Sequence, residues 1–210
     1  MAFIRTDGTL QFDRITSPVE VQANYLASRR DGIGIDDGIS IYTGLMPWNW
    51  GAPGCSHTSV GYWIDGELWF FSSTSRKELG GKNGTRWIRG TKLLRNPERW
   101  KLQVKALSKR SLAGEAEVAI RVRRANRLIG LGYDFYGVGA DFINPIRVLI
   151  KRELCEAIKK LKKIYCSKTV HAVQTGIIAV YSPRRKYKWA KKNGYKTIEN
   201  TWSYLNKIGV

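Results

Sequence analysis

The chain has few of the residues that build metal sites and disulfide frameworks. It holds three cysteines and two histidines among 210 residues. Cys55, Cys155 and Cys166 cannot all pair with one another, and none stands in a C-x-x-C spacing. This usage argues against a disulfide scaffold and a zinc site, and it fits a reducing compartment. We therefore expect no metal and no cofactor.

Long hydrophobic runs are also missing. The best apolar run, residues 176–181, is far shorter than the roughly 18 residues that a membrane span needs. Residues 1–8 lack the apolar core of a signal peptide. We expect no transmembrane segment, synthesis in the cytoplasm and no export by the ordinary secretory route. Assembly into a virion is compatible with this expectation.

Acidic residues are scarce. The chain has 17 Asp and Glu against 36 Lys and Arg, which gives a formal net charge of +19. Such an excess draws a protein to polyanions such as nucleic acid, wall polymers or anionic lipid. Many of the cations stand late in the chain, in residues 159–163 and 184–192. A solvated basic face on helices is the plainer interpretation of each single run.

The length and the apolar content favour one domain. The chain has 210 residues, of which 43% are hydrophobic, so residues 1–210 can form a single domain with its own core. Ser17-Pro18-Val19-Glu20 has a cap residue, proline at the first helical position and glutamate three residues after the cap. This pattern predicts a helix to about Arg30, within a helical lead-in over 1–38. A basic segment over 183–210 closes the domain.

The clearest local signal is a β-hairpin. Residues 58–64 and 67–74 flank Asp65-Gly66, a two-residue sequence typical of tight hairpin turns. If Ile64 pairs with Glu67, counting outward sets His57 opposite Thr74. Alternation then predicts one shared face for the side chains at positions 57, 59, 72 and 74.

The remaining patterns complete an α+β fold with a small antiparallel sheet packed against helices. We expect further strands at 9–15, 39–42, 86–88, 100–107 and 195–198, and helices at 112–128, 146–164 and 166–180. The glycine clusters at 32–34 and 130–132 do not stand between a strand and a helix as phosphate loops do. They are interpreted as turns.

Cys166 is the candidate nucleophile because it stands where a helix is predicted to begin. A catalytic cysteine must react as the thiolate, so its pKa has to be lowered. The first turn of a helix favours an anion through its N–H groups and the positive end of the dipole. The same N–H groups can hold an oxyanion. A buried structural cysteine is the alternative, since Ile164 and Tyr165 precede it.

His57 is the candidate base. It stands at a junction between a loop and a strand, facing the second strand of the predicted hairpin. The other histidine, His171, lies five residues after Cys166, which a helix turns about 140° away from it. We therefore interpret His171 as structural.

These motifs resemble the circularly permuted branch of the NlpC-type papain-like cysteine hydrolases, the group that includes YiiX/YebB-like proteins. Residues 56–61 (SHTSVG) resemble the family's S-H-x-G histidine strand, with one extra residue before Val60-Gly61. Tyr133-Asp134 with Gly137 is similar to its Y-D-x-x-G turn, and residues 165–167 (YCS) resemble its C-S-E nucleophile motif. The histidine precedes the cysteine, as in the permuted branch, and the similarity covers roughly residues 39–205.

The resemblance implies a permuted papain-like fold and a set of site residues. Cys166 would attack, His57 would act as the base, and Ser72 or Ser73 would orient the imidazole. Tyr133 and Asp134 would support the site, and Trp48 and Trp50 would line the mouth of the substrate cleft. The family carries Glu where this chain has Lys168, and often Glu where it has Ser72 or Ser73. A serine can orient an imidazole but cannot stabilise imidazolium as a carboxylate does.

Two functional hypotheses follow. The first is a thiol hydrolase that cleaves amide bonds, with the resemblance implying peptidoglycan stem peptides as substrate and a phage virion as the carrier. The second is a catalytically inactive basic protein that serves a virion as a structural or nucleic-acid-binding component. The serine at the expected glutamate position and the +19 charge motivate the second.

Overall fold

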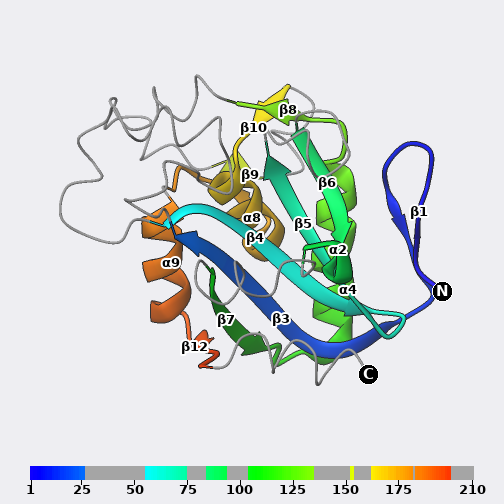
Figure 1. Cartoon of the computed structure of the whole chain (residues 1–210), viewed down its shortest axis with the longest axis horizontal. Helices are drawn as coiled ribbons and strands as arrows, with labels where there is room; N and C mark the ends of the chain where they lie inside the picture. Colours follow the sequence, from blue (N-terminus) through cyan, green and yellow to red (C-terminus); the bar gives the residue numbers. More distant parts are fainter. Residues whose placement is uncertain are drawn as a thin grey trace.

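The computed structural model describes residues 1–26, 55–74, 84–93, 104–134, 152–153, 162–181 and 183–199. They form a mixed α+β structure (Figure 1). Its strands are β1 (Phe3–Ile4), β2 (Leu10–Gln11), β3 (Ile15–Leu26), β4 (Cys55–Ile64), β5 (Glu67–Thr74), β6 (Gly84–Arg89), β7 (Val104–Arg110), β8 (Gly132–Tyr133), β9 (Arg152–Glu153), β10 (Lys163–Ile164), β11 (Ile177–Ile178) and β12 (Lys196–Thr197). Its helices are α2 (Gly90–Leu93), α4 (Gly114–Arg127), α8 (Cys166–Thr175) and α9 (Pro183–Lys192).

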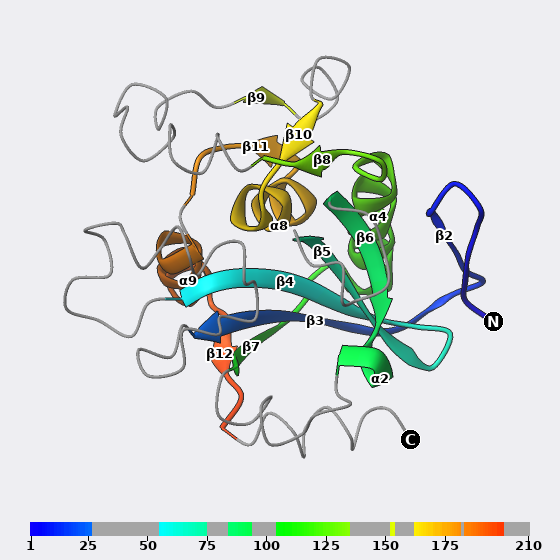
Figure 2. The same ribbon diagram turned by 45° about the horizontal axis from the view of Figure 1, so that its top comes forward.

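A six-stranded antiparallel sheet organises the fold. Its strands follow the order β12-β7-β3-β4-β5-β6. The helices α4 and α8 lie on one side of this sheet, and α9 lies beside the end at which β4 begins (Figure 2). The predicted α+β class and the sheet packed against a cysteine-bearing helix are therefore confirmed.

The predicted hairpin is confirmed with its register. Ile64 pairs with Glu67, and Val60 pairs with Phe71. Asp65 and Gly66 both have positive φ, 50° and 81°, which is the backbone that a tight primed turn requires. The twist of such a turn matches the twist of the strands, so the local sequence fixes which side chains share a face.

The predicted helix from Ser17 to Arg30 is wrong where the structure describes it, because β3 occupies residues 15–26. The strand pairs with β4 on one side and β7 on the other. Pro18 lies where the pairing with β4 is interrupted, a position that tolerates the missing N–H. Val19, Val21 and Ala23 also alternate with polar residues at a period of two, and this pattern prevails over the capping signal.

Two other helix predictions need correction. The predicted helix over 146–164 is contradicted at both of its described parts, since residues 152–153 form β9 and 163–164 form β10. The helix predicted over 166–180 ends at Thr175. Gly176 ends it in the left-handed conformation, with φ of 78° and its N–H on the carbonyl of Ala172. The helix predicted over 112–128 and the strand at 86–88 are confirmed by α4 and β6.

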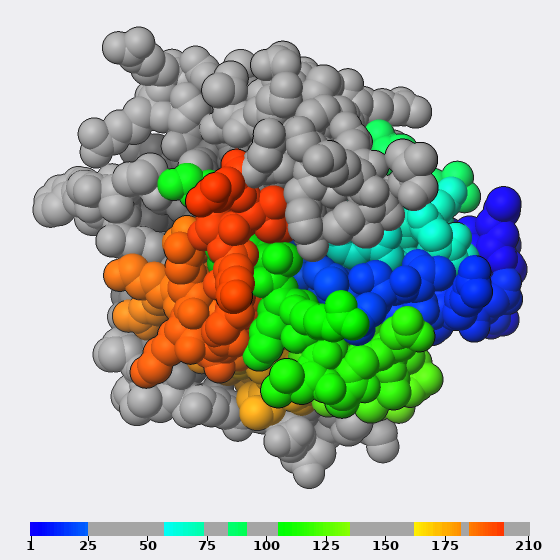
Figure 3. Space-filling view, turned by 90° about the horizontal axis from the view of Figure 1, so that it is seen from below, coloured from blue at the N-terminus to red at the C-terminus, as the bar shows by residue number. Residues whose placement is uncertain are grey.

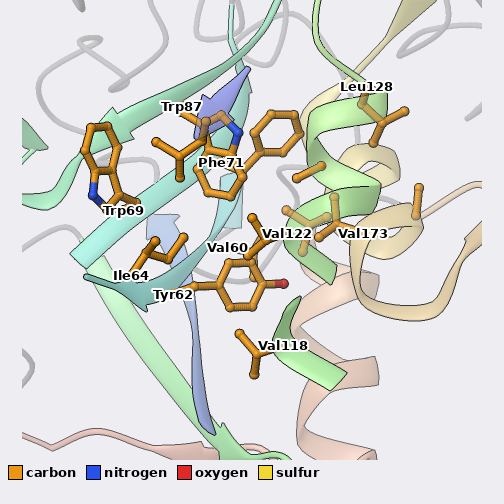
Figure 4. Packing of buried hydrophobic residues seen from close by; sticks show 14 of the residues in the cluster. Val60, Tyr62, Ile64, Trp69, Phe71, Trp87, Val118, Val122, Leu128 and Val173 are labelled. Carbon is orange, nitrogen blue, oxygen red and sulfur yellow. The ribbon is translucent and has the colours of Figure 1, made fainter. Parts of the chain in front are cut away.

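The main core lies between the sheet and the helices α4 and α8. Val60, Tyr62 and Phe71 of the hairpin point toward Val122 of α4 and Val173 of α8 (Figure 4). All of these side chains are buried. The face of the hairpin that carries Val60 and Phe71 is therefore the face that α8 covers, which decides where the neighbouring polar side chains lie.

Candidate functional site

Cys166 is the first residue of α8, as predicted. Tyr165, directly before it, has an extended backbone with φ of −103° and ψ of 168°, so the chain passes from strand β10 into the helix within two residues. The carbonyl of Tyr165 accepts the N–H of Thr169 at 2.9 Å, which closes the first helical turn. The Cys166 thiol thus stands at the positive end of the helix dipole, and the side chain is 2% exposed.

Two other predicted site residues, Tyr133 and Ser73, contact the segment that leads into this helix. Strand β10 runs parallel to β8, and Ile164 pairs with Tyr133. Asp134 directly follows Tyr133 in the chain, after the end of β8. The hydroxyl of Ser73 donates to the carbonyl of Ile164 at 2.7 Å. Segments that are distant in the sequence thus meet at the start of α8.

His57 and Ser72 share a face, as the hairpin register predicts, and the structure shows them in contact. The Nε2 atom of His57 lies 2.9 Å from Oγ of Ser72, and both side chains are buried. Of the two serines considered from the sequence, Ser72 therefore contacts the imidazole, whereas the described hydrogen bond of Ser73 goes to the backbone before α8. The serine hydroxyl can set the orientation of the ring.

Strand alternation directs the imidazole away from the face of the sheet that α8 covers. His57 pairs with Tyr25, and Thr58 pairs with Asn24, so the pairing is regular up to His57. Strand alternation places His57 on the face opposite to Thr58 and Val60. Val60 faces α8, so the ring of His57 leaves the sheet on the other side. The structure thus joins His57 to Ser72, and it places Ser73 and Tyr133 beside Ile164, two residues before Cys166.

Several predicted residues lie outside the described part of the chain. Trp48, Trp50 and Cys155 are among them, and Cys55 is described only in its backbone. Within the described residues no group of His, Cys, Asp or Glu is placed to hold a metal ion. In the same part of the chain, no helix is long and apolar enough to cross a bilayer.

A buried polar cluster is centred on Glu20, and the sequence patterns considered above did not predict it. Its carboxylate accepts hydrogen bonds from the Tyr62 hydroxyl at 2.7 Å, from Arg121 Nη1 at 2.8 Å and from Gln174 Nε2 at 2.5 Å. The hydroxyl of Tyr195 also donates to it. The donors come from β4, α4, α8 and the segment before β12, so one carboxylate connects four parts of the fold. Alternation of polar residues in 20–24 was the signal that could have revealed this cluster.

The cluster carries a consistent set of pKa shifts. Burial raises the pKa values of Tyr62 and Tyr195 well above the ordinary value, and the negative charge of Glu20 adds to the effect. Burial alone would lower the pKa of Arg121, but its interactions with Glu20, Tyr62 and Tyr195 together outweigh burial and raise that pKa. Both tyrosines therefore stay neutral and Arg121 stays charged at physiological pH.

His171 belongs to a second buried cluster on α8, which agrees with a structural role. Its Nδ1 atom lies 3.3 Å from Nζ of Lys186 in α9, and its ring packs on those of Tyr181 and Trp189. The Nζ of Lys186 lies 3.2 Å from the centre of the Trp189 ring. Burial lowers the pKa of Lys186 well below its ordinary value, and the charge of Arg121 lowers it further against the opposing attraction of Glu20.

We expect Lys186→Met to stabilise the protein at pH 7 by about 1–4 kcal/mol, the scale found when buried ionic groups are replaced by apolar ones. Because the folded-state pKa of Lys186 is depressed, the unfolded chain binds more protons between that pKa and about 10.4. The cost of burying Lys186 therefore falls as the pH rises across that window, and the free energy of unfolding of the wild type rises. The advantage of Lys186→Met should shrink between pH 7 and pH 10, as measured by urea unfolding.

The matched control is Lys188→Met, which changes an exposed lysine of the same helix. It should alter the unfolding free energy by no more than about 0.5 kcal/mol at either pH. A Lys186→Met advantage that grows toward pH 10 would contradict the expected sign.

The chain matches no protein-family model, no curated protein and no solved structure. Its function therefore has to be inferred from its own residues.

Proposed function

We propose that the protein is a thiol hydrolase of the permuted papain-like type that cleaves amide bonds. Cys166 is the nucleophile, His57 is the base and Ser72 orients the imidazole. The observation that carries the proposal is the position of the Cys166 thiol at the first residue of α8, directly after strand β10. This position favours the thiolate and supplies backbone N–H groups for an oxyanion.

In the proposed reaction, one ring nitrogen of His57 contacts Ser72 and the other acts on the Cys166 thiol. Nε2 contacts Ser72, so Nδ1 is the nitrogen that takes the proton of the thiol. The Cys166 sulfur then bonds to the carbonyl carbon, and His57 returns the proton to the leaving amine as the amide bond breaks. Water attacks the thioester in the second half of the reaction, with the proton passing again to His57, and restores the thiol.

The proposed dyad requires His57 to turn to the face that α8 covers. The pairing of β3 with β4 is irregular next to this residue, between the pairs Tyr25–His57 and Leu26–Cys55. A one-residue shift of a strand turns its side chains to the other face, and β-bulges re-aim side chains near active sites. Moving this bulge by one residue, to the far side of His57, turns the imidazole toward α8. The buried Cys166 must become accessible in the same rearrangement.

The resemblance to the permuted family supports this assignment in two ways. The strand has one extra residue before Val60-Gly61 relative to the family pattern, and an extra residue in a strand is accommodated as a bulge. The Tyr133-Asp134 motif lies in register beside the residues before Cys166. On this basis we propose peptidoglycan stem peptides as the substrate, and a virion-borne enzyme that opens the wall locally.

The direct test compares the wild-type protein with Cys166→Ser on purified peptidoglycan. The wild type should release peptides with new amino termini, and the variant should release them at least about 100-fold more slowly, because a serine hydroxyl is not activated as a thiolate is. Equal release by the two proteins would overturn the proposal. Heated wild type measures release that requires no folded enzyme.

The alternative is a catalytically inactive basic protein with a structural role in a virion. The direction of the imidazole, away from the face of the sheet that α8 covers, favours it, as does a serine where the family carries a carboxylate. In this case Cys166 is a structural thiol, and wild type and Cys166→Ser both leave peptidoglycan intact.

A further inference from the structure

A group of basic side chains surrounds α9 at one edge of the sheet. We call this group the basic face, and its members are Lys105, Lys109, Arg185, Lys188, Lys191, Lys192 and Lys196. Lys109 is partly exposed, and the others are exposed. The helix α9 and the strands β12 and β7 that carry them adjoin on one side of the molecule (Figure 3).

The packing of α9 explains why its cations point outward. Ala190 of α9 is buried against Leu107 of β7 and Tyr195. Lys186, four residues before Ala190, is also buried, so these two positions mark the inner side of the helix. Arg185, Lys188 and Lys192 stand at i, i+3 and i+7 and form one stripe on the outer side. These three side chains are therefore exposed because the opposite side of α9 packs against the rest of the protein.

Strand β7 extends this surface beyond the helix. Leu107 lies under α9, and Lys105 and Lys109 flank it on the same face of the strand. The Nζ of Lys109 lies 5.6 Å from the centre of the Tyr195 ring, which ties this lysine to the segment that follows α9. The cations of the helix and of the strand thus belong to one continuous surface.

Acidic residues are few around this surface. Residues 181–198 contain no Asp or Glu, and neither do residues 100–111. Among the described residues, Glu117 attracts Lys109 but is itself hydrogen-bonded to Ser111 and Arg121. Glu20, opposite Lys109 in the sheet, is buried and already accepts four hydrogen bonds. The exposed Glu199 follows β12. The potential over the basic face is therefore strongly positive and attracts an extended polyanion.

We propose that the basic face binds the phosphate backbone of double-stranded nucleic acid without sequence preference. The stripe from Arg185 to Lys192 spans about 10 Å along α9, a length over which a duplex presents about six phosphate charges. A membrane surface fits less well, because interfacial helices insert large apolar side chains beside their cations. The exposed large apolar residues of the described chain, Met1, Phe3, Ile4, Leu112 and Ile120, lie outside the basic face.

The test measures binding of fluorescent duplexes of two unrelated sequences to the full chain over a range of salt concentrations. The wild type should bind both duplexes with similar affinity and a steep salt dependence. The triple variant R185Q/K188Q/K192Q should lower the slope of log K against log salt by about 2.7, since each phosphate contact contributes about 0.9.

The matched control is R5Q/R14Q/R123Q, which removes three exposed arginines distant in sequence from α9. Both triple variants carry the same net charge, so they differ only in where charge is lost. The control should lower the slope by less than about 1. Equal loss in both variants would show that the attraction is diffuse and would overturn the proposal.

Two further outcomes would overturn it. One is no binding of duplex by the wild type at low salt. The other is loss of sedimentation with purified peptidoglycan in R185Q/K188Q/K192Q while duplex binding persists, which would make a wall polymer the ligand. Cys166→Ser should bind duplex like the wild type, so a failure of the hydrolase proposal and a failure of this one are separate results.

Discussion

Replacing Glu20 with alanine is expected to lower the free energy of unfolding by about 3–5 kcal/mol, the cost of removing one partner of a buried ion pair. The carboxylate lies in the interior and accepts hydrogen bonds from Arg121, Tyr62, Gln174 and Tyr195. Without it, the guanidinium of Arg121 loses its buried counter-charge. Thermal or urea unfolding measures the loss, and for a domain of this size the melting temperature should fall by about 6–20 °C.

A double variant shows whether the buried charge is the cause. Glu20→Leu with Arg121→Met removes both charges. It should recover most of the stability lost in Glu20→Ala, because no unpaired ion remains buried in the double variant. Glu115→Ala is the control on an exposed carboxylate and should cost no more than about 0.5 kcal/mol. A Glu20→Ala variant as stable as the wild type would show that the cluster does not hold the four elements together.

Replacing His57 with alanine is expected to lower the rate of peptidoglycan cleavage by about 10²–10⁴-fold, the usual contribution of a general base. The variant should also shift the pH dependence of Cys166 alkylation by iodoacetamide to higher pH, because the imidazolium no longer favours the thiolate. Alkylation is followed by mass spectrometry of the Cys166 peptide. Ser72→Ala should lower the rate less than His57→Ala, since it removes only the group that orients the ring.

His171→Gln is the control on the other histidine, and its melting curve reports whether it folds. Folded His171→Gln should cleave within a few-fold of the wild type, because its ring serves the contact between α8 and α9. If His57→Ala cleaves at the wild-type rate, or if its alkylation profile matches that of the wild type, His57 does not act on Cys166. The sheet then keeps the two residues apart in the working protein as well.

The sequence predicted best where the local chemistry is decisive. The Asp65-Gly66 turn predicted the register of the hairpin, and that register predicted the face that His57 shares with Ser72. The start of α8 at Cys166 was also predictable, because the apolar stripe of Val170 and Val173 begins there. In both cases residues within a few positions of one another contain the information.

The same local rules failed at residues 17–26. The cap pattern of Ser17 to Glu20 predicts a helix in isolation, yet the segment pairs on both sides as the third strand of the sheet order. Glu20 is stabilised there by partners that lie 42 to 175 residues away in the sequence. The cap pattern covers only neighbouring residues and carries no information on these partners. It therefore could not show that the segment forms a strand.

The amino-acid sequence by itself determined the turn, the identity of the candidate nucleophile and base, the α+β class and the strong positive charge. Only the tertiary structure decided which face of the sheet each side chain occupies relative to α8. It also decided that one buried carboxylate would connect β3, β4, α4 and α8, and that the cations of α9 and β7 would form a single surface. The physical reason is that pairing and burial between distant segments supply most of the free energy, whereas turn and cap preferences supply about 1 kcal/mol each.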